Sequence, residues 1–199
     1  MRTGELGFWW RSVGGPGPAR PALSGPAEAD VAIVGAGYTG LWTAYYLKRA
    51  EPALRIVVLE REVAGFGASG RNGGWVSGFF SGPARVYERR GGPEGFAALQ
   101  RTMFETVDEV GRVLADHEID ADFLKAGHLS VALNEPQALR LRETVAAARA
   151  HGLGEADLRE LSHGELEDRL RVAGARGATF SPHVAPRAPA TLSRSSSSP

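Results

Sequence analysis

The stretch DVAIVGAGYTGLWTAYYL, residues 30–47, predicts the fold class of this chain. It begins with a short β-branched run at 31–34, the pattern of a buried parallel strand, and a turn of glycines follows. The next residues have a helical pattern that ends before Pro52. A second apolar run at 56–60 predicts another buried strand. Strand, turn, helix and strand in this order predict an α/β fold with parallel strands.

The turn carries the pattern GxGxxG, formed by Gly35, Gly37 and Gly40. In such a turn the first glycine permits the bend, the second lets a pyrophosphate approach the backbone, and the third lets the helix pack close to the strand. Glu60 ends the second strand 20 residues after Gly40, which is the spacing of a carboxylate that binds ribose hydroxyls and repels a 2′-phosphate. We therefore expect a Rossmann-like dinucleotide-binding domain. The alternative is a glycine-rich turn without a ligand.

A second glycine cluster, AGFGASGRNGGWVSG at 64–78, has too many glycines for a helix or a strand, so we expect a loop. A plain NAD domain has no need of a second long glycine-rich loop directly after the ribose-binding strand. This cluster therefore favours FAD over NAD, with a flexible surface linker as the other interpretation.

The sequence resembles the D-amino acid oxidase-like (DAO) family of FAD-dependent oxidoreductases over most of its length. The similarity is carried by residues 30–47, by GASGRNGG at 67–74 and by the aromatic N-terminal arm at Phe8, Trp9 and Trp10. Its gamma-glutamylputrescine oxidase-like members are the most similar. The resemblance implies an α/β, Rossmann-like FAD-binding domain with part of an α+β substrate domain that is incomplete at the C-terminus.

The resemblance also implies a set of cofactor-binding residues. They are Gly35, Gly37 and Gly40 at the pyrophosphate, Glu60 at the adenosine ribose, Arg61 near the adenine, Ser69 and Arg71 at phosphate or ribityl oxygens, and Asn72, Gly73 and Gly74 beside the isoalloxazine. The chain has no cysteine, so a cysteinyl flavin is excluded and we expect FAD to bind non-covalently.

Members of this family oxidise a C–H bond beside an amine nitrogen by hydride transfer to the flavin. The resemblance thus implies a small amine or amino-acid substrate and molecular oxygen or another electron acceptor. Two alternatives stay open. In the first, the chain is a catalytically inactive fragment that binds FAD or another nucleotide. In the second, it is an NAD-dependent reductase, and this alternative leaves the second glycine cluster unexplained.

Composition excludes several other classes of function. The 23 Lys and Arg balance the 23 Asp and Glu, so we expect no nucleic-acid partner. Arg11 interrupts the early apolar cluster and glycines interrupt the stretch 31–47, so we expect neither a signal peptide nor a membrane span, and a cytoplasmic protein. We expect no metal site. The catalytic residue is unknown, and His183 is the one histidine that we consider for the substrate pocket.

We expect four parts along the chain: an N-terminal arm at 1–29, the FAD-binding part at 30–92, a helical segment and partial substrate domain at 93–184, and a disordered tail at 185–199. The expected elements of the third part are a helix with the stripe Phe96, Leu99, Met103, Val107, Val110 and Leu114, a strand at 127–133, a helix capped by Asn134 with Pro136 in its first turn and ending at Gly152, a short helix with the capping box Ser162 and Glu165, and a strand at 178–180.

Family members are considerably longer. The resemblance ends near residues 184 and 185, and the last dozen or so residues have no periodicity and end in a serine run. We interpret this change as the result of a reading-frame shift or a truncated gene. Because half of the substrate pocket is then missing, we expect the 199-residue chain to be inactive alone.

Overall fold

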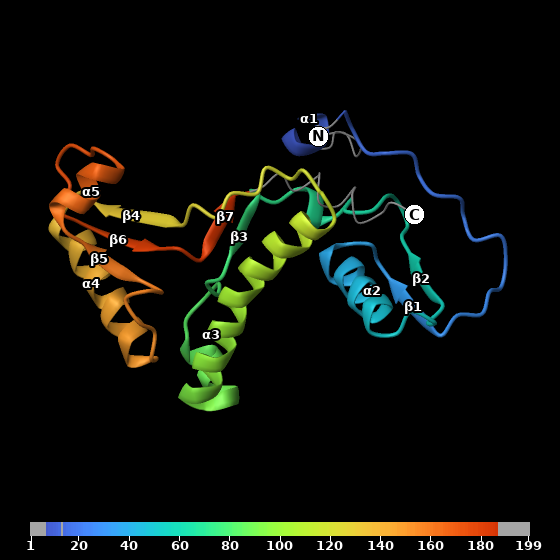
Figure 1. Ribbon diagram of the computed structural model, residues 1–199, viewed down its shortest axis with the longest axis horizontal. Helices are drawn as coiled ribbons and strands as arrows, with labels where there is room; N and C mark the ends of the chain where they lie inside the picture. Colours follow the sequence, from blue (N-terminus) through green and yellow to red (C-terminus); the bar gives the residue numbers. More distant parts are fainter. Residues whose placement is uncertain (1–6, 13, 187–199) are drawn as a thin grey trace. The chain divides into compact units, whose positions relative to one another are not determined.

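The structure, a computed structural model, describes residues 7–12 and 14–186, which form two compact units (Figure 1). The first unit comprises residues up to 74 together with 118–122, and the second comprises 75–117 and 123–186. The boundary that we expected at 92 lies inside the second unit. Residues 1–6 and 187–199, which include most of the expected tail, lie outside the described residues.

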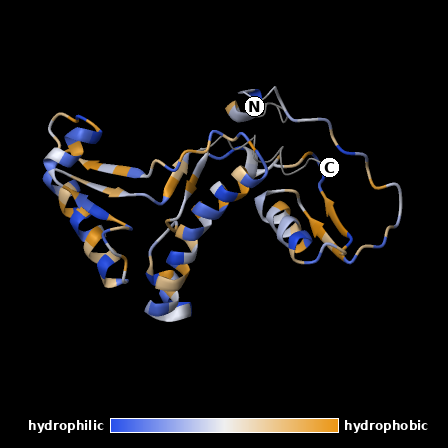
Figure 2. Ribbon diagram, viewed as in Figure 1, coloured by the Kyte–Doolittle hydropathy of each residue, from blue (hydrophilic) through white to orange (hydrophobic). Residues whose placement is uncertain are grey.

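The first unit contains the strand, turn, helix and strand predicted from the sequence. Strands β1 (Val31–Val34) and β2 (Ile56–Leu59) pair in parallel, and helix α2 (Tyr38–Ala50) connects them. Figure 2 shows both strands as hydrophobic, but no residue of either strand is fully buried, which differs from the buried strands predicted from the sequence. The α/β prediction for this region is nonetheless confirmed.

The two strands are also joined by an ion pair at their starts. The Arg55 guanidinium donates to both carboxylate oxygens of Asp30, over 3.2 Å and 3.0 Å, and the Arg55 amide donates to the same carboxylate over 2.8 Å. These bonds hold the pKa of the Asp30 carboxyl below its usual range. The pair is exposed, so its main effect is to fix the strand register and not to add much stability.

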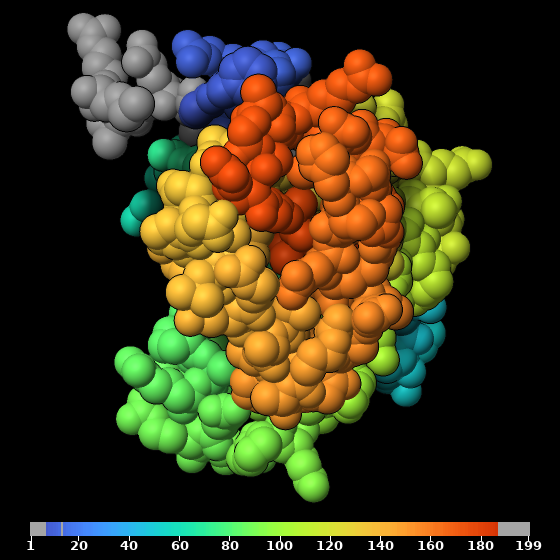
Figure 3. All heavy atoms as spheres, turned by 90° about the vertical axis from the view of Figure 1, so that its left-hand side faces the viewer, coloured from blue at the N-terminus to red at the C-terminus, as the bar shows by residue number. Residues whose placement is uncertain are grey.

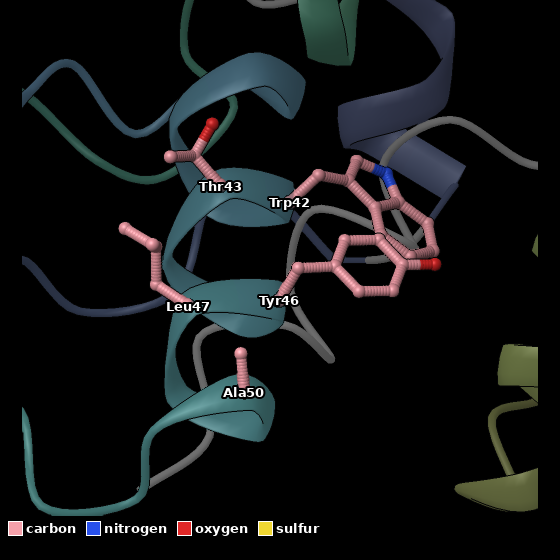
Figure 4. A pocket seen from close by; sticks show the side chains of 5 residues that line it. All are labelled: Trp42, Thr43, Tyr46, Leu47 and Ala50. Carbon is pink, nitrogen blue, oxygen red and sulfur yellow. The ribbon is translucent and has the colours of Figure 1, made fainter.

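Much of the apolar surface of this unit is uncovered. None of the residues of α2, all of which the structure describes, is fully buried, and Val34 at the end of β1 is 87% exposed. Figure 4 shows side chains of α2 around a surface hollow, where Trp42 and Tyr46 stack with their ring centroids 5.6 Å apart. This helix and this sheet cover each other on one side only.

The N-terminal arm carries a short helical turn at its aromatic residues, α1 (Phe8–Ser12), and Trp10 is buried. The second glycine cluster has more structure than a loop. It contains both the 3-10 turn η1 (Ala68–Gly70) and strand β3 (Trp75–Ser77).

The second unit contains two antiparallel sheets. One consists of β4 (His128–Ala132), β6 (Gly177–Ser181) and β5 (Arg159–Leu161) in the order β4-β6-β5. The other pairs β3 with β7 (Val184–Pro186). The unit also contains the long helix α3 (Arg85–Asp116) and the helices α4 (Glu135–Ala150) and α5 (His163–Arg169). Figure 3 shows atoms of α4 and α5 on one of its faces.

The predicted helix caps of the second unit are confirmed. The Asn134 side chain accepts from the Gln137 amide, and Ser162 and Glu165 form a reciprocal capping box. The strands β5 and β7 were not expected from the sequence. Residues 185 and 186 pair with β3, so the disordered tail that we expected from 185 does not begin there.

Helix α3 (Arg85–Asp116) bends at Gly92, which has a φ of 68° and precedes Pro93. Its buried face includes most of the expected stripe, namely Phe96, Val107, Val110 and Leu114. Leu99 differs, since it is 40% exposed, and the neighbouring face residues Gln100 and Phe104 are buried. The Gln100 side chain turns inward because its Nε2 donates to the Gly78 carbonyl over 2.5 Å. Among the described residues, no helix is long and apolar enough to cross a membrane.

Phe104 is central to the core of the second unit, where it joins a cluster that includes Val145, Leu153 and Leu158. We expect Phe104→Ala to lower the free energy of unfolding by about 3–5 kcal/mol, because it leaves a cavity in this cluster. Leu99→Ala, on the same helix but exposed, is the control and should change it by less than about 1 kcal/mol. Urea unfolding measures both, and equal effects would contradict this description of the helix face.

Candidate functional site

The two glycine-rich segments meet directly in the first unit. The Tyr38 amide donates to the Ser69 hydroxyl oxygen over 2.9 Å, and a Cβ built on Gly37 would lie 3.0 Å from that oxygen. The Gly65 amide donates to the Ala36 carbonyl over 2.8 Å. We expected both segments to contact one cofactor, and the structure brings them together where helix α2 begins.

The GxGxxG turn depends on glycine at two positions for different reasons. Gly35 has a φ of +100°, which side-chain-bearing residues rarely adopt. A Cβ on Gly40 would lie 2.1 Å from the Gly35 carbonyl oxygen and 3.2 Å from a methyl of Ile33. The third glycine therefore allows the helix to lie against the turn and strand β1, as the sequence predicts.

The start of α2 offers backbone donors. Gly37 is the N-cap residue and provides no side-chain cap, so the first amides of the helix depend on groups from other segments. Ser69 is such a group, since its hydroxyl accepts from Tyr38. Amides at a helix N-terminus, with the positive end of the helix dipole, favour an anion at this position.

Glu60 follows β2 and reaches back to the same turn. Its Oε2 accepts from the Ala36 amide over 2.9 Å, and its Oε1 accepts from the Glu62 amide over 3.1 Å. The Ala36 bond is the main reason that the pKa of Glu60 is lowered. Burial opposes it by raising the pKa, and the Glu62 bond adds a smaller lowering effect. Each carboxylate oxygen has a further lone pair, so Glu60 remains able to accept from hydroxyl groups.

The remaining expected residues differ in how far they are fixed. Arg61 is exposed and bonds to its neighbour Glu62. The Arg71 guanidinium donates to the Phe66 carbonyl over 2.8 Å and lies over the Phe66 ring, so it closes its own loop. Asn72 does the same: its side chain donates to the Ser69 carbonyl over 2.9 Å and accepts from the Gly74 amide over 2.9 Å.

The sequence missed the part played by the peptide of Ala36, which bonds to Glu60 through its amide and to Gly65 through its carbonyl. A backbone contact of this kind has no residue signature. The hydroxyl of Ser69 was expected to bind phosphate or ribityl oxygens, and its bond to the helix start was not foreseen.

His183 lies in the core of the second unit. Its ring stacks on Phe104 with centroids 3.7 Å apart, and its Nε2 lies 3.1 Å from the Asp157 carboxylate. Its Nδ1 is buried and has no hydrogen-bond partner among the described residues. Over the same residues, no three His, Cys, Asp or Glu side chains gather as metal ligands. We assign no catalytic residue.

The chain matches the family described as FAD dependent oxidoreductase (DAO) over residues 30–193. It belongs to this family. The resemblance drawn from the glycine-rich segments is thereby confirmed, and the match continues past residues 184 and 185, where we expected it to end.

Relatives and solved structures of the family are longer than this chain. Gamma-glutamylputrescine oxidoreductase from Escherichia coli K12 is 40% identical over 121 residues, which are 61% of this chain and 28% of that protein. Glycine oxidase from Geobacillus kaustophilus is 25% identical with a TM-score of 0.56, covering 84% of this chain and 43% of the other. L-amino acid deaminase from Proteus myxofaciens is 22% identical with a TM-score of 0.64, covering 89% and 37%, and shows the fold alone.

The contact at Gly40 gives a test of the turn. Gly40→Ala should lower the free energy of unfolding by about 1–3 kcal/mol or more, because the added methyl meets a backbone carbonyl that cannot move aside. Gly95→Ala is the control: it is also in a helix, and no described atom lies within 4 Å of its Cβ position. It should be neutral or stabilising by about 0.5–1 kcal/mol. Similar losses in both variants would refute the packing role of Gly40.

The lowered pKa of Glu60 predicts a pH dependence. Since the folded state favours the ionised carboxylate, its stabilising effect is present above the unfolded value of about 4.3 and is lost as the pH falls further. The stability advantage of the natural chain over Glu60→Gln should therefore shrink below about pH 4. Glu62→Gln, which keeps the bond between Glu60 and the Ala36 amide, is the control. Urea unfolding above and below about pH 4 measures the stability of all three proteins. An equal stability difference between the natural chain and Glu60→Gln above and below this pH would contradict the stabilising role of the ionised Glu60 carboxylate.

Proposed function

We propose that this chain binds FAD non-covalently as the cofactor-binding part of an oxidoreductase that oxidises amines or amino acids. The observation that carries this proposal is the contact between the two glycine-rich segments at Tyr38 and Ser69, beside the ionised carboxylate of Glu60. When bound, the flavin would accept a hydride from the substrate carbon beside the nitrogen.

The residues present fit the phosphates of this cofactor. Gly37 has no side chain at the start of α2, and a Cβ there would fill the space next to Ser69. The amides of this first turn would bind the pyrophosphate, and the Ser69 hydroxyl, which now accepts from Tyr38, would be free to donate to a phosphate or ribityl oxygen. Gly35 and Gly40 would hold the turn in the shape that exposes these amides.

The residues around the two ends of the cofactor follow the same proposal. Glu60 would accept from the hydroxyls of the adenosine ribose, and Arg61, which is exposed, would lie near the adenine. Arg71 and Asn72 keep the second segment folded by bonds within it. The backbone of residues 72–74 would then approach the isoalloxazine without side chains in the way, except for that of Asn72.

The relatives support the substrate class. By their names, one relative acts on gamma-glutamylputrescine and another on glycine, and both substrates carry an amine nitrogen. We propose a small amine or amino acid as substrate of the whole protein and molecular oxygen as electron acceptor. The chain's own residues would position FAD and leave the substrate pocket to be completed by further residues.

A second candidate function is FAD binding without turnover. It is favoured by the uncovered side chains of α2 and by the exposure of Val34, because parallel strands are normally covered on both faces. The chain spans 28% of the first relative's length. We expect no oxidation of amines by the isolated 199-residue chain.

FAD titration of the purified chain tests the proposal. We expect flavin absorbance to remain with the natural chain, and Gly37→Val to weaken FAD binding at least about tenfold, because its side chain occupies the space beside Ser69. Gly95→Val, on an open helix surface, is the control and should bind normally.

The alternatives give different outcomes in the same experiment. Peroxide formed with an amine substrate would show turnover by the chain alone. A colourless protein that binds NAD in place of FAD would contradict the proposal and support a reductase. Equal FAD binding by Gly37→Val and the natural chain would contradict the assignment of the pyrophosphate to this turn.

A further inference from the structure

Trp10 is buried although it lies in a helix of five residues near the start of the chain. Only 1% of its surface is exposed, whereas Phe8 in the same helix is 65% exposed. A helix this short has little stability of its own, so contacts of Trp10 with the rest of the first unit must hold it in place.

The indole ring lies against the second glycine-rich segment. A Cβ built on Gly70 would be 2.8 Å from both Cζ2 and Nε1 of Trp10, and 2.5 Å from the Gly65 carbonyl oxygen. The ring therefore touches a backbone position that only glycine allows. The Trp10 ring and the Gly65 carbonyl thus both lie against Gly70, the last residue of η1.

Packing and not hydrogen bonding holds the ring there. The indole Nε1 is buried, and no group among the described residues accepts its proton. Leaving a buried donor unpaired lowers stability. A tryptophan at this position is therefore explained by the large apolar area that its ring contributes.

The covered turn leads directly to the proposed cofactor site. Gly70 follows Ser69, whose hydroxyl meets the Tyr38 amide at the start of α2. Displacing η1 would displace Ser69. Four amides of this segment are hydrogen-bonded and so report on its order: those of Gly65, Phe66, Arg71 and Gly74.

We propose that Trp10 is a positioning residue, which holds residues 65–74 in the conformation that receives the cofactor. The link to FAD rests on the proposed function. The packing of Trp10 on the segment does not.

Hydrogen exchange of the full chain tests the packing without FAD. Trp10→Ala should accelerate exchange of the bonded amides in 65–74 at least about tenfold, and Trp10→Phe a few-fold, because the smaller ring loses less area. Phe8→Ala is the matched control and should leave these amides unchanged. Exchange in α4, in the second unit, should stay the same in all variants.

Unchanged exchange at 65–74 in both Trp10 variants, or equal acceleration by Phe8→Ala, would overturn the proposal. If Trp10→Ala also loses protection in α4, the chain has unfolded globally and Trp10→Phe decides: acceleration confined to 65–74 supports the proposal, and its absence refutes it.

FAD titration of the same variants tests the link to the cofactor. Trp10→Ala should weaken FAD binding at least about tenfold, Phe8→Ala should not, and saturating FAD should restore slow exchange at 65–74 in Trp10→Phe. Accelerated exchange with unchanged FAD affinity would refute the positioning role. If the natural chain binds no FAD, the proposed function fails, and exchange alone decides whether Trp10 holds the segment.

Discussion

The hydrogen bonds around the start of α2 are the interactions on which the proposed site depends. The Ala36 amide donates a hydrogen bond to Glu60, and the Ala36 carbonyl accepts one from Gly65. A third hydrogen bond joins the Tyr38 amide to the Ser69 hydroxyl. These contacts bring together residues that lie more than 20 positions apart in the sequence. They require other segments to approach the backbone of the turn closely, which its glycines allow.

The two units differ in how completely they are packed. The second has a core around Phe104 that brings α4 and the following residues together. The first has a well-formed turn between β1 and α2, but the apolar side chains of these two elements are partly uncovered. Binding of a cofactor and turnover of a substrate are therefore separate questions for this chain. The described residues form the glycine-rich turn, but the helix and strand beside it are only partly covered.

Elements with a local signal were predictable from the sequence. The capping box of Ser162 and Glu165 and the Asn134 cap each lie within four residues of the helix that they start, and both are confirmed. The strands β3, β5 and β7 were missed because each has three residues and exists through pairing with a distant strand. Most of the predicted buried face of α3 is confirmed, but Leu99 is 40% exposed, and the neighbouring Gln100 is buried because its side chain donates to the Gly78 carbonyl.

For the candidate site, the order of residues was enough to identify the glycines that form the turn and the carboxylate that follows, since GxGxxG and Glu60 are set by local backbone geometry and spacing. Three features became visible in the folded chain alone: the second glycine-rich segment lies on this turn, Arg71 and Asn72 hold their own loop, and Trp10 packs on Gly70. Such contacts join distant segments through backbone atoms and ring packing, and neither of these leaves a periodic pattern in the order of residues.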